Sequence, residues 1–307
     1  MSEPAGRLER LARSSRFVVT AEVVPPRSAD AEPLTAQARE LVGYADAANV
    51  TDNPTASAHM SPLAGVAAVA DAGIEPTIQL TTRDRNRLAL TADLLGAWAL
   101  GARNLLCLSG DPIAVGDDPG APEVRDLDVL ELVRLATRLR TERRLASGAV
   151  IEPAPRYFVG VADSPLAPGY DAGRLEAKLD AGARFVQTQI AFDLDALERW
   201  AEVVRSRGVF ERAAVIVGVA PLRSARQARY LDEHLPGVSV PRAIVEVLRD
   251  AGDGAEAEGL RIAIDIVRRL QAIQGIAGIH VMGLGRERAV RHLIDATGLA
   301  PRPVAAP

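Results

Sequence analysis

The chain has 307 residues, 48% of them hydrophobic and 25% charged, so its composition predicts a folded protein with a large core and excludes a disordered chain. It carries 40 acidic and 36 basic residues, a net charge of −4, which excludes an overall cationic surface for nucleic acid or anionic lipid. The single cysteine, Cys107, cannot form an internal disulfide, and no group of Cys and His residues has the spacing of a zinc site.

The N-terminal segment 1–17 contains Glu3 and Glu9 and lacks the apolar stretch of about seven residues that a signal peptide needs. Apolar runs elsewhere are shorter than the roughly 18 residues of a membrane-spanning helix. We therefore expect a cytoplasmic protein that acts on small molecules, with no metal and with neither nucleic acid nor a membrane as partner. Residues 1–15 are expected to form a helical or flexible extension, and residues 300–307 a flexible tail.

Eight short segments rich in β-branched residues follow one another along the chain and predict β-strands. Amphipathic stretches with apolar residues at helical spacing lie between them. Continuous apolar strands that alternate with helices are typical of a parallel sheet buried on both faces, and eight such units close most readily into a barrel. We therefore predict a single α/β domain over residues 1–307, a (β/α)8 TIM barrel. The predicted strands are 17–23, 47–51, 76–81, 104–110, 157–162, 185–190, 214–219 and 278–284.

Two features depart from a plain barrel. The segment 111–122, DPIAVGDDPGAP, is too long for an ordinary connection between a strand and a helix, and we interpret it as a candidate lid. Between the seventh and eighth strands the sequence has room for extra helices, at about 223–234, 241–251 and 256–274. We interpret this extra material as an elaboration of the same domain.

Polar side chains near strand ends are the candidates for chemistry, because a barrel carries its active site where the strands end. Glu22 stands between Ala21 and Val23 on the first strand, and a glutamate is almost never buried without a partner. Its structural explanation is an ion pair with Arg27 or another arginine. Its functional explanation is a catalytic acid.

Further strand ends offer polar groups of the same kind. The second strand ends in Thr51, Asp52 and Asn53, the third contains Gln79 and the fourth leads into Asp111. Helix caps and turns explain such residues about as well as ligand binding does.

The sixth strand carries two amides, Gln187 and Gln189, at alternating positions. Alternation places both on one face of the strand. They either line the mouth of the barrel or form a satisfied polar network in its core.

The sequence lacks the motifs of several large enzyme classes: no G-x-G-x-x-G follows a strand, and G-x-x-x-x-G-K-[ST], G-x-S-x-G and H-E-x-x-H do not occur. The nearest glycine pattern is Gly283-Leu284-Gly285-Arg286 after the last strand. Barrels often bind phosphate there, at a helix N-terminus. An ordinary tight turn explains the pattern equally well.

An ordered series of short motifs resembles the methylenetetrahydrofolate reductases over roughly Phe17 to Leu299. The segment AEVVPPR (21–27) is similar to the family's E-F-F-P-P-R, and VTDN, Q-L-T, SGDP, KLDAGARFVQTQIAFD, VGVAP and Val240-Pro241 follow in the family's order and spacing. The resemblance implies a (β/α)8 barrel that reduces 5,10-methylenetetrahydrofolate to 5-methyltetrahydrofolate. It also implies a nicotinamide nucleotide, NADH or NADPH, as the source of electrons.

The resemblance assigns roles to particular residues. Glu22 matches the family's general acid, Asp111 the aspartate near the pterin, and Gln189 the glutamine that binds the folate. Gln79 and Gln187 are expected on the folate side as well. The chemistry agrees with these roles, because opening the five-membered ring requires a proton on the departing amine nitrogen and leaves an iminium for hydride.

The family's flavin site is kept only in part. Thr51, Asp171 and Lys178 stand at positions that match FAD-binding residues. Replacements elsewhere remove stacking area and phosphate-pairing charge, so we expect no bound FAD. The family's histidine before L-T, its arginine before G-D, and the aromatic and the histidine of its Y-P-E-x-H-P segment are replaced by Gln79, Ser109, Ala162 and Leu166.

Without FAD, NADH or NADPH would deliver its hydride directly to the iminium from a position beside the folate. Lys178 and Arg286 are expected to pair with its diphosphate. Two other interpretations stay open: the same reaction relayed through bound FAD, and a non-catalytic folate-binding barrel. The expected cofactor-binding residues are Thr51, Asn53, Asp171, Lys178 and Arg286.

Overall fold

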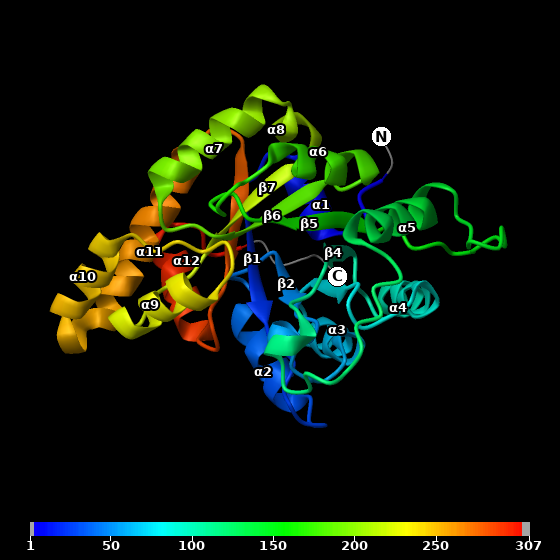
Figure 1. Cartoon of the computed structure of the whole chain (residues 1–307), viewed down its shortest axis with the longest axis horizontal. Coiled ribbons are helices and arrows are strands. Elements are labelled where there is room, and N and C mark those ends of the chain that lie inside the picture. Colours follow the sequence, from blue (N-terminus) through cyan, green and yellow to red (C-terminus); the bar gives the residue numbers. More distant parts are fainter. Residues whose placement is uncertain (1–2, 303–307) are drawn as a thin grey trace.

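The computed structural model describes residues 3–302 and forms a closed barrel of eight parallel strands (Figure 1). Each strand is hydrogen-bonded to the next, and β8 closes the barrel on β1. The predicted (β/α)8 fold is confirmed, and each predicted strand is present. The strands are β1 (Val18–Val23), β2 (Ala47–Val50), β3 (Pro76–Thr81), β4 (Asn104–Leu108), β5 (Phe158–Asp163), β6 (Phe185–Ile190), β7 (Ala214–Val219) and β8 (Ile276–Val281).

Helices alternate with the strands and cover the outside of the barrel (Figure 1). Several begin at side chains that favour helix starts: Asp128 and Glu131 form a reciprocal capping box, and Ser61 and Asn86 cap two other helices. The helices are α1 (Arg7–Arg13), α2 (Glu32–Leu41), α3 (Pro62–Asp71), α4 (Arg87–Ala99), α5 (Val129–Thr141), α6 (Ala172–Ala181), α7 (Leu194–Ser206), α8 (Val209–Arg212), α9 (Ala225–His234), α10 (Arg242–Asp250), α11 (Ala255–Ala272) and α12 (Glu287–Ala296), with 3-10 turns η1 (Pro54–Ala56), η2 (Ile113–Val115) and η3 (Gly252–Gly254).

The main hydrophobic core lies between the outer face of the barrel and the helices. On β1, Val19, Ala21 and Val23 belong to this core, whereas Val18 belongs to a separate cluster inside the barrel. This division follows from strand geometry, because successive side chains point to opposite faces. Burial on both faces explains why the strands appear in the sequence as nearly continuous apolar runs.

A smaller apolar cluster fills the barrel interior where the strands begin, and Leu8 of α1 is part of it. Phe158 of β5 and Phe185 of β6 pack with their ring centroids 4.9 Å apart. A Cβ atom on Gly160 would lie 2.1 Å from the Phe185 ring, so only glycine leaves room for this ring. The cluster forms an apolar plug at this end of the barrel, and the polar residues of the interior lie toward the other end.

Both ends of the described chain are held by ion pairs at the end of the barrel where the strands begin. Arg7 of α1 and Arg302 bind the carboxylate of Asp46 at 2.6 and 2.5 Å. Residues 300–302 of the predicted tail are therefore held against the barrel, and residues 303–307 lie outside the described residues. Helix α1 lies within the predicted N-terminal extension.

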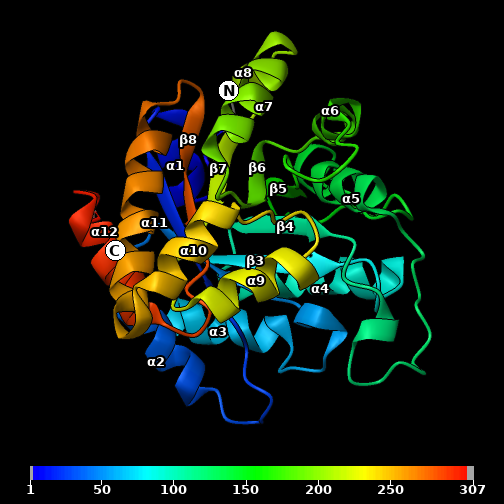
Figure 2. The same ribbon diagram turned by 60° about the vertical axis from the view of Figure 1, so that its left-hand side comes forward.

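Three helices connect β7 to β8, in agreement with the prediction of extra helical material there. Helix α9 packs on α10 and α10 packs on α11, and α11 runs back along β7 and β8 (Figures 1 and 2). The connection therefore contains one crossover helix and an added pair, shown in yellow and orange at one side of the barrel.

Some features are missing from residues 3–302. No helix there combines the length and the apolar character needed to cross a membrane. No three His, Cys, Asp or Glu side chains gather there as a metal site would require. Cys107 is buried, and burial raises the pKa of its thiol, so the thiol stays protonated and unreactive.

Candidate active site at the barrel mouth

Polar side chains replace apolar ones in the barrel interior above the plug. Asn49 of β2 donates from Nδ2 to Oε1 of Gln187 on β6 at 3.0 Å. These two strands are not neighbours, so this hydrogen bond crosses the interior. Thr20 of β1 and His280 of β8 form a second pair, with Oγ1 and Nδ1 2.9 Å apart. Gln187 therefore takes part in a buried polar network, the structural alternative considered for the two glutamines.

Glu22 lies near the C-terminal end of β1, next to this polar layer, with its side chain 21% exposed. Its Oε2 accepts a hydrogen bond from Nε2 of Gln79 at 3.4 Å and lies 3.8 Å from Nε2 of His280. Arg27, the predicted structural partner, pairs instead with Asp117. Glu22 therefore faces an amide and an imidazole, and its proposed ion pair with Arg27 is not formed.

Asp111 begins the 111–122 loop, and this loop is fastened to the segment after β2. Its Oδ2 accepts a hydrogen bond from the backbone N of Thr55 in η1 at 2.9 Å. Further along the loop, Asp117 accepts one from the backbone N of Ala58 at 3.1 Å. The long loop is therefore anchored at the rim of the barrel, and its opening as a lid stays a prediction.

Arg83 ties three strand ends together, although the sequence analysis did not single it out. Its guanidinium donates to the backbone oxygens of Asn53, after β2, at 3.2 Å and of Asp111, after β4, at 3.1 Å. It also binds the carboxylate of Asp84 through Nε at 2.6 Å and Nη2 at 2.7 Å. The hydrogen bond to Asp84 raises the pKa of the Arg83 guanidinium. This arginine, 1% exposed, therefore stays charged and uses its charge inside the protein.

The three polar residues after β2 differ in their contacts. Asp52 holds Arg85 through two hydrogen bonds of 2.7 and 2.9 Å and also accepts from Thr81. Asn53 has a φ of +44° and accepts a backbone hydrogen bond within its own turn at 3.1 Å, as expected for an asparagine in a turn. The hydroxyl of Thr51 is buried without a hydrogen-bond partner among the described residues, so Thr51 alone has unused hydrogen-bonding capacity.

The two glutamines of β6 do not act as a pair. The register of β6 against β7 shifts between Gln187 and Ile190. Gln189 is half-buried, and its Nε2 donates to the backbone oxygen of Pro236 at 3.3 Å. Gln189 therefore lies beside the segment after α9, whereas Gln187 lies inside the barrel.

Asp171 directly precedes α6, the helix that follows β5, and Lys178 lies on this helix. Asp171 caps this helix by accepting a hydrogen bond from the backbone N of Gly173 at 2.8 Å. Lys178 donates from Nζ to the backbone oxygen of Ala162, near the end of β5, at 2.6 Å. Burial lowers the pKa of Lys178, and the negative charge of Asp163 partly opposes this shift. Burial also raises the pKa of Asp163, and the positive charge of Lys178 partly opposes that shift. These two groups form a partly buried pair at the end of β5.

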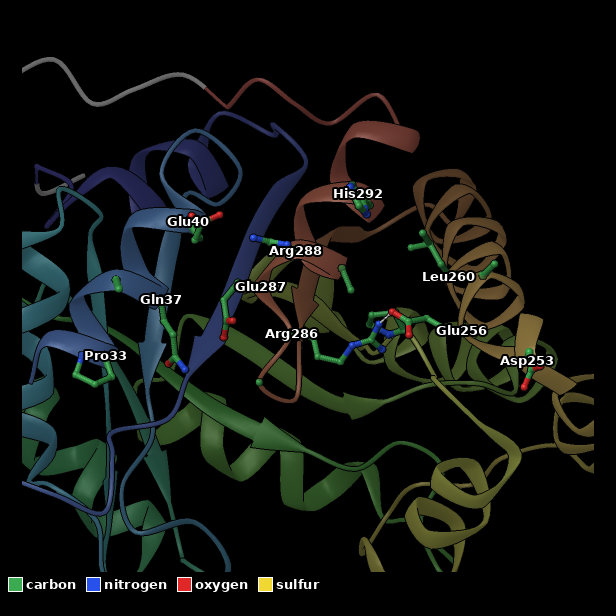
Figure 3. Close-up of a pocket in the computed structure, with 15 residues that line it drawn as sticks. Pro33, Gln37, Glu40, Asp253, Glu256, Leu260, Arg286, Glu287, Arg288 and His292 are labelled. Atoms are coloured by element: carbon green, nitrogen blue, oxygen red, sulfur yellow. Dashed lines mark ion pairs between the residues drawn. The ribbon is translucent and has the colours of Figure 1, made fainter. Parts of the chain in front are cut away.

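Arg286 lies apart from the other candidates. It pairs with Glu256 of α11 and lines a pocket of about 920 Å³ between α2, α11 and α12 (Figure 3). Carboxylates outnumber arginines in this lining, which does not favour a diphosphate. Arg286 contacts α11, whereas Lys178 contacts the end of β5, so the two cations have partners on different elements. The charged lining residues, histidine aside, are Glu40, Asp253, Glu256, Glu287, Arg286 and Arg288.

Comparison with known families identifies the family of this chain. The family model described as methylenetetrahydrofolate reductase matches residues 7–298. The chain belongs to the methylenetetrahydrofolate reductase family. The resemblance found in the sequence motifs is thereby confirmed.

Curated relatives carry the name of the family. The probable methylenetetrahydrofolate reductase (NADPH) of Caenorhabditis elegans is 26% identical over 317 residues, which cover 95% of this chain and 44% of that protein. The 5,10-methylenetetrahydrofolate reductase of Escherichia coli (strain K12) is 25% identical over 232 residues, 75% of this chain and 72% of that protein. This chain spans less than half of the C. elegans protein and of methylenetetrahydrofolate reductase 1 from Schizosaccharomyces pombe.

Solved structures share the barrel fold. A protein from Clostridium thermocellum described as binding two copies of 5-methyl-5,6,7,8-tetrahydrofolic acid has a TM-score of 0.66 at 12% identity, over 96% of this chain and 99% of that chain. Tryptophan synthase from Mycobacterium tuberculosis has a TM-score of 0.51 at 16% identity, over 97% of this chain and 99% of that chain. At these identities the likeness shows the fold alone.

Proposed function

We propose that this protein reduces 5,10-methylenetetrahydrofolate to 5-methyltetrahydrofolate, with Glu22 as the general acid. Membership of the methylenetetrahydrofolate reductase family supports this reaction. The observation that carries the assignment of Glu22 is the position of its carboxylate near the strand ends, facing Gln79 and His280 instead of Arg27. An ion pair of purely structural purpose would join this carboxylate to a cation.

The chemistry requires one proton and one hydride. When the carbon–nitrogen bond of the methylene bridge breaks, the departing amine nitrogen takes the proton from Glu22 and an iminium remains on the other nitrogen. The hydride then adds to the iminium carbon and gives the methyl group. Glu22 is left as a carboxylate, and it takes up a proton from water before the next cycle through its exposed side.

The folate-binding residues come from several strand ends. Asp111 follows β4, Gln189 lies near the end of β6, and Gln79 lies on β3 beside Glu22. We assign Asp111 to the pterin's amino and ring N–H groups, since a carboxylate accepts such hydrogen bonds and favours the developing cation. Gln187, bound to Asn49, acts on the folate only through this buried network.

Asp111→Asn is expected to lower kcat/KM for methylenetetrahydrofolate about 10- to 150-fold, the equivalent of one hydrogen bond to a charged group. The KM for NADH should change by less than about twofold. Steady-state kinetics with each substrate varied in turn measures both effects.

Asp117→Asn is the matched control for Asp111→Asn, because Asp117 lies in the same loop and also accepts a hydrogen bond from the segment after β2. If the control reduces kcat/KM as much as Asp111→Asn does, loop anchoring is the cause. Equal losses for both substrates would also contradict the placement of Asp111 on the pterin side.

The cationic side chains near the ends of β3 and β5 do not fit a resident FAD. Arg83 is bound by Asp84, and Arg85 by Asp52 and Asp93. Lys178 donates to a backbone oxygen of β5. A flavin held permanently needs a binding free energy near the nanomolar range, about −12 kcal/mol, whereas a transient co-substrate functions at about −4 to −8 kcal/mol. Because these cations are already bound to other groups of the protein, they argue against tightly bound FAD more strongly than against a transiently bound NAD(P)H.

We propose that NADH or NADPH delivers the hydride directly. Relatives named for NADPH and for NADH both occur, in C. elegans and in Arabidopsis thaliana. We assign Lys178 as the partner of the NAD(P)H diphosphate, with Asp171 after the same strand, β5, and with Thr51 and Asn53 after β2. Arg286 would first have to leave Glu256.

Direct transfer is expected to give sequential initial-rate kinetics, because both substrates must be bound together with the reacting carbons about 3 to 3.5 Å apart. Double-reciprocal lines should intersect, and added FAD should not change the rate. The purified protein should show no flavin absorbance near ~450 nm. Parallel lines, or stoichiometric FAD in the protein, would restore the flavin relay. A protein that binds folate but does not turn over would be the non-catalytic barrel.

A further inference from the structure

His280 is a buried histidine that the proposed reaction does not yet use. Its side chain is 0% exposed and lies on β8 inside the barrel. Its Nδ1 is 2.9 Å from Oγ1 of Thr20. Its Nε2 has no hydrogen-bond partner among the described residues and lies 3.8 Å from Oε2 of Glu22. A buried polar atom without a partner is uncommon and calls for an explanation.

The contacts of Thr20 allow two arrangements of the hydrogens on His280. The hydroxyl of Thr20 has one hydrogen and two possible acceptors: Nδ1 of His280 at 2.9 Å and the backbone oxygen of Ile279 at 3.4 Å. The shorter contact is the better hydrogen bond. In one arrangement Thr20 donates to Nδ1 along this shorter contact, and the imidazole hydrogen is on Nε2, toward Glu22. In the other, Nδ1–H donates to Oγ1 and the hydroxyl donates to the oxygen of Ile279. The role of His280 proposed below requires the first arrangement, and the tautomer is tested directly.

We propose that His280 is a positioning residue whose Nε2–H receives the Glu22 carboxylate as Glu22 gives up its proton. This inference rests on the proposed role of Glu22 as the acid. The separation of 3.8 Å is too long for a hydrogen bond, whereas bonds from N–H to an ionised carboxylate close to about 2.7 to 3 Å. The contact is therefore weak before proton transfer and becomes strong during it.

A contact that strengthens as charge develops lowers the barrier without tightening substrate binding. His280 neither gains nor loses a proton: the proton passes from Glu22 to the departing amine, and the electron pair of the O–H bond stays on the carboxylate. Gln79 supplies a second N–H to the same oxygen, at 3.4 Å. The two donors approach Glu22 from β3 and β8, on either side of β1 and β2.

The test compares His280→Leu, which removes the donor, with His280→Gln, whose amide can place an N–H near the position of Nε2. His280→Leu is expected to lower kcat about 100-fold, as does loss of one donor to a developing oxyanion, with the folate KM changed by less than about twofold. His280→Gln should recover kcat to within about tenfold of wild type, since a neutral hydrogen bond is restored.

Thr20→Val tests the tautomer, with Thr77→Val as its control. Thr77 is also a buried threonine on a barrel strand, and its hydroxyl has no partner among the described residues. Nitrogen-15 NMR of histidine-labelled protein should show His280 protonated at Nε2 in the wild type. Thr20→Val should shift this tautomer and lower kcat, whereas Thr77→Val should leave both unchanged.

Several results would overturn the inference. The first is a His280→Leu variant that keeps more than about a third of wild-type kcat. The second is a His280→Leu variant whose loss appears in the folate KM instead of kcat. The third is a wild-type His280 that is protonated at Nδ1. If His280→Leu does not fold, the kcat values of His280→Gln and Thr20→Val test the inference in its place. Wild-type protein without reductase activity, or an active Glu22→Gln variant, would overturn the proposed function itself. Activity abolished by Glu22→Gln but kept by His280→Leu would overturn the inference alone.

Discussion

Glu22→Gln is expected to lower the kcat of methylenetetrahydrofolate reduction about 100- to 10,000-fold, the usual contribution of a general acid. The amide has the shape of the acid and cannot donate a proton to the departing amine. It can still accept the hydrogen bond that Gln79 donates at 3.4 Å. The variant should therefore fold normally and bind folate with nearly unchanged affinity.

The measurements are kcat at saturating substrates, the folate dissociation constant and the thermal unfolding temperature. Glu32→Gln is a suitable control, because Glu32 lies on α2 with its side chain 67% exposed and pairs with Arg39 on the surface. This control should keep wild-type kcat. Glu22 is not the acid if its glutamine variant retains more than about a tenth of wild-type turnover.

Asp46→Ala is expected to lower the free energy of unfolding by about 3 to 5 kcal/mol, the cost of removing one partner of a buried ion pair. The Asp46 carboxylate is fully buried and binds both Arg7 and Arg302, whose side chains are 11% and 10% exposed. It also accepts a hydrogen bond from the backbone N of Val19 at 2.9 Å. Alanine would leave two nearly buried cations and this backbone N–H without their partner.

Urea denaturation of Asp46→Ala and of wild type measures this difference. Asp71→Ala is the matched control, because Asp71 is 75% exposed and its ion pair with Arg39 is long, at 3.7 Å. Surface pairs contribute about 0 to 1 kcal/mol. A loss at Asp46 no larger than the loss at Asp71 would show that the cluster does not fasten the two ends of the chain.

The eight strands and the extra helices between β7 and β8 were predictable because they depend on local pattern. Runs such as AVIVGV (214–219) are apolar at every position because both faces of the strand are buried. Period and chain order are enough to recognise alternating strands and helices, and eight of each indicate a closed barrel. The prediction of Glu22 came from the same pattern, as a charged residue inside an apolar strand.

His280 carried a similar signal and was overlooked. It stands in GIHVMGL (278–284), a polar residue among apolar ones on a strand, just as Glu22 does. Its meaning depends on Thr20, which is 260 positions away in the sequence. Such a pair is visible only after β8 closes on β1.

The tertiary structure alone decided which polar groups meet. Arg83 reaches the strand ends after β2 and β4, whereas Lys178 and Arg286 follow strands that β6 and β7 separate. In the sequence all three are simply cations in segments that follow strands. The alternation of residues along a strand predicts which face of the sheet a side chain occupies. Its contacts depend on how the barrel closes and on the length of the side chain. The sequence therefore predicts the fold and singles out Glu22, and the closed barrel determines which side chains surround this glutamate.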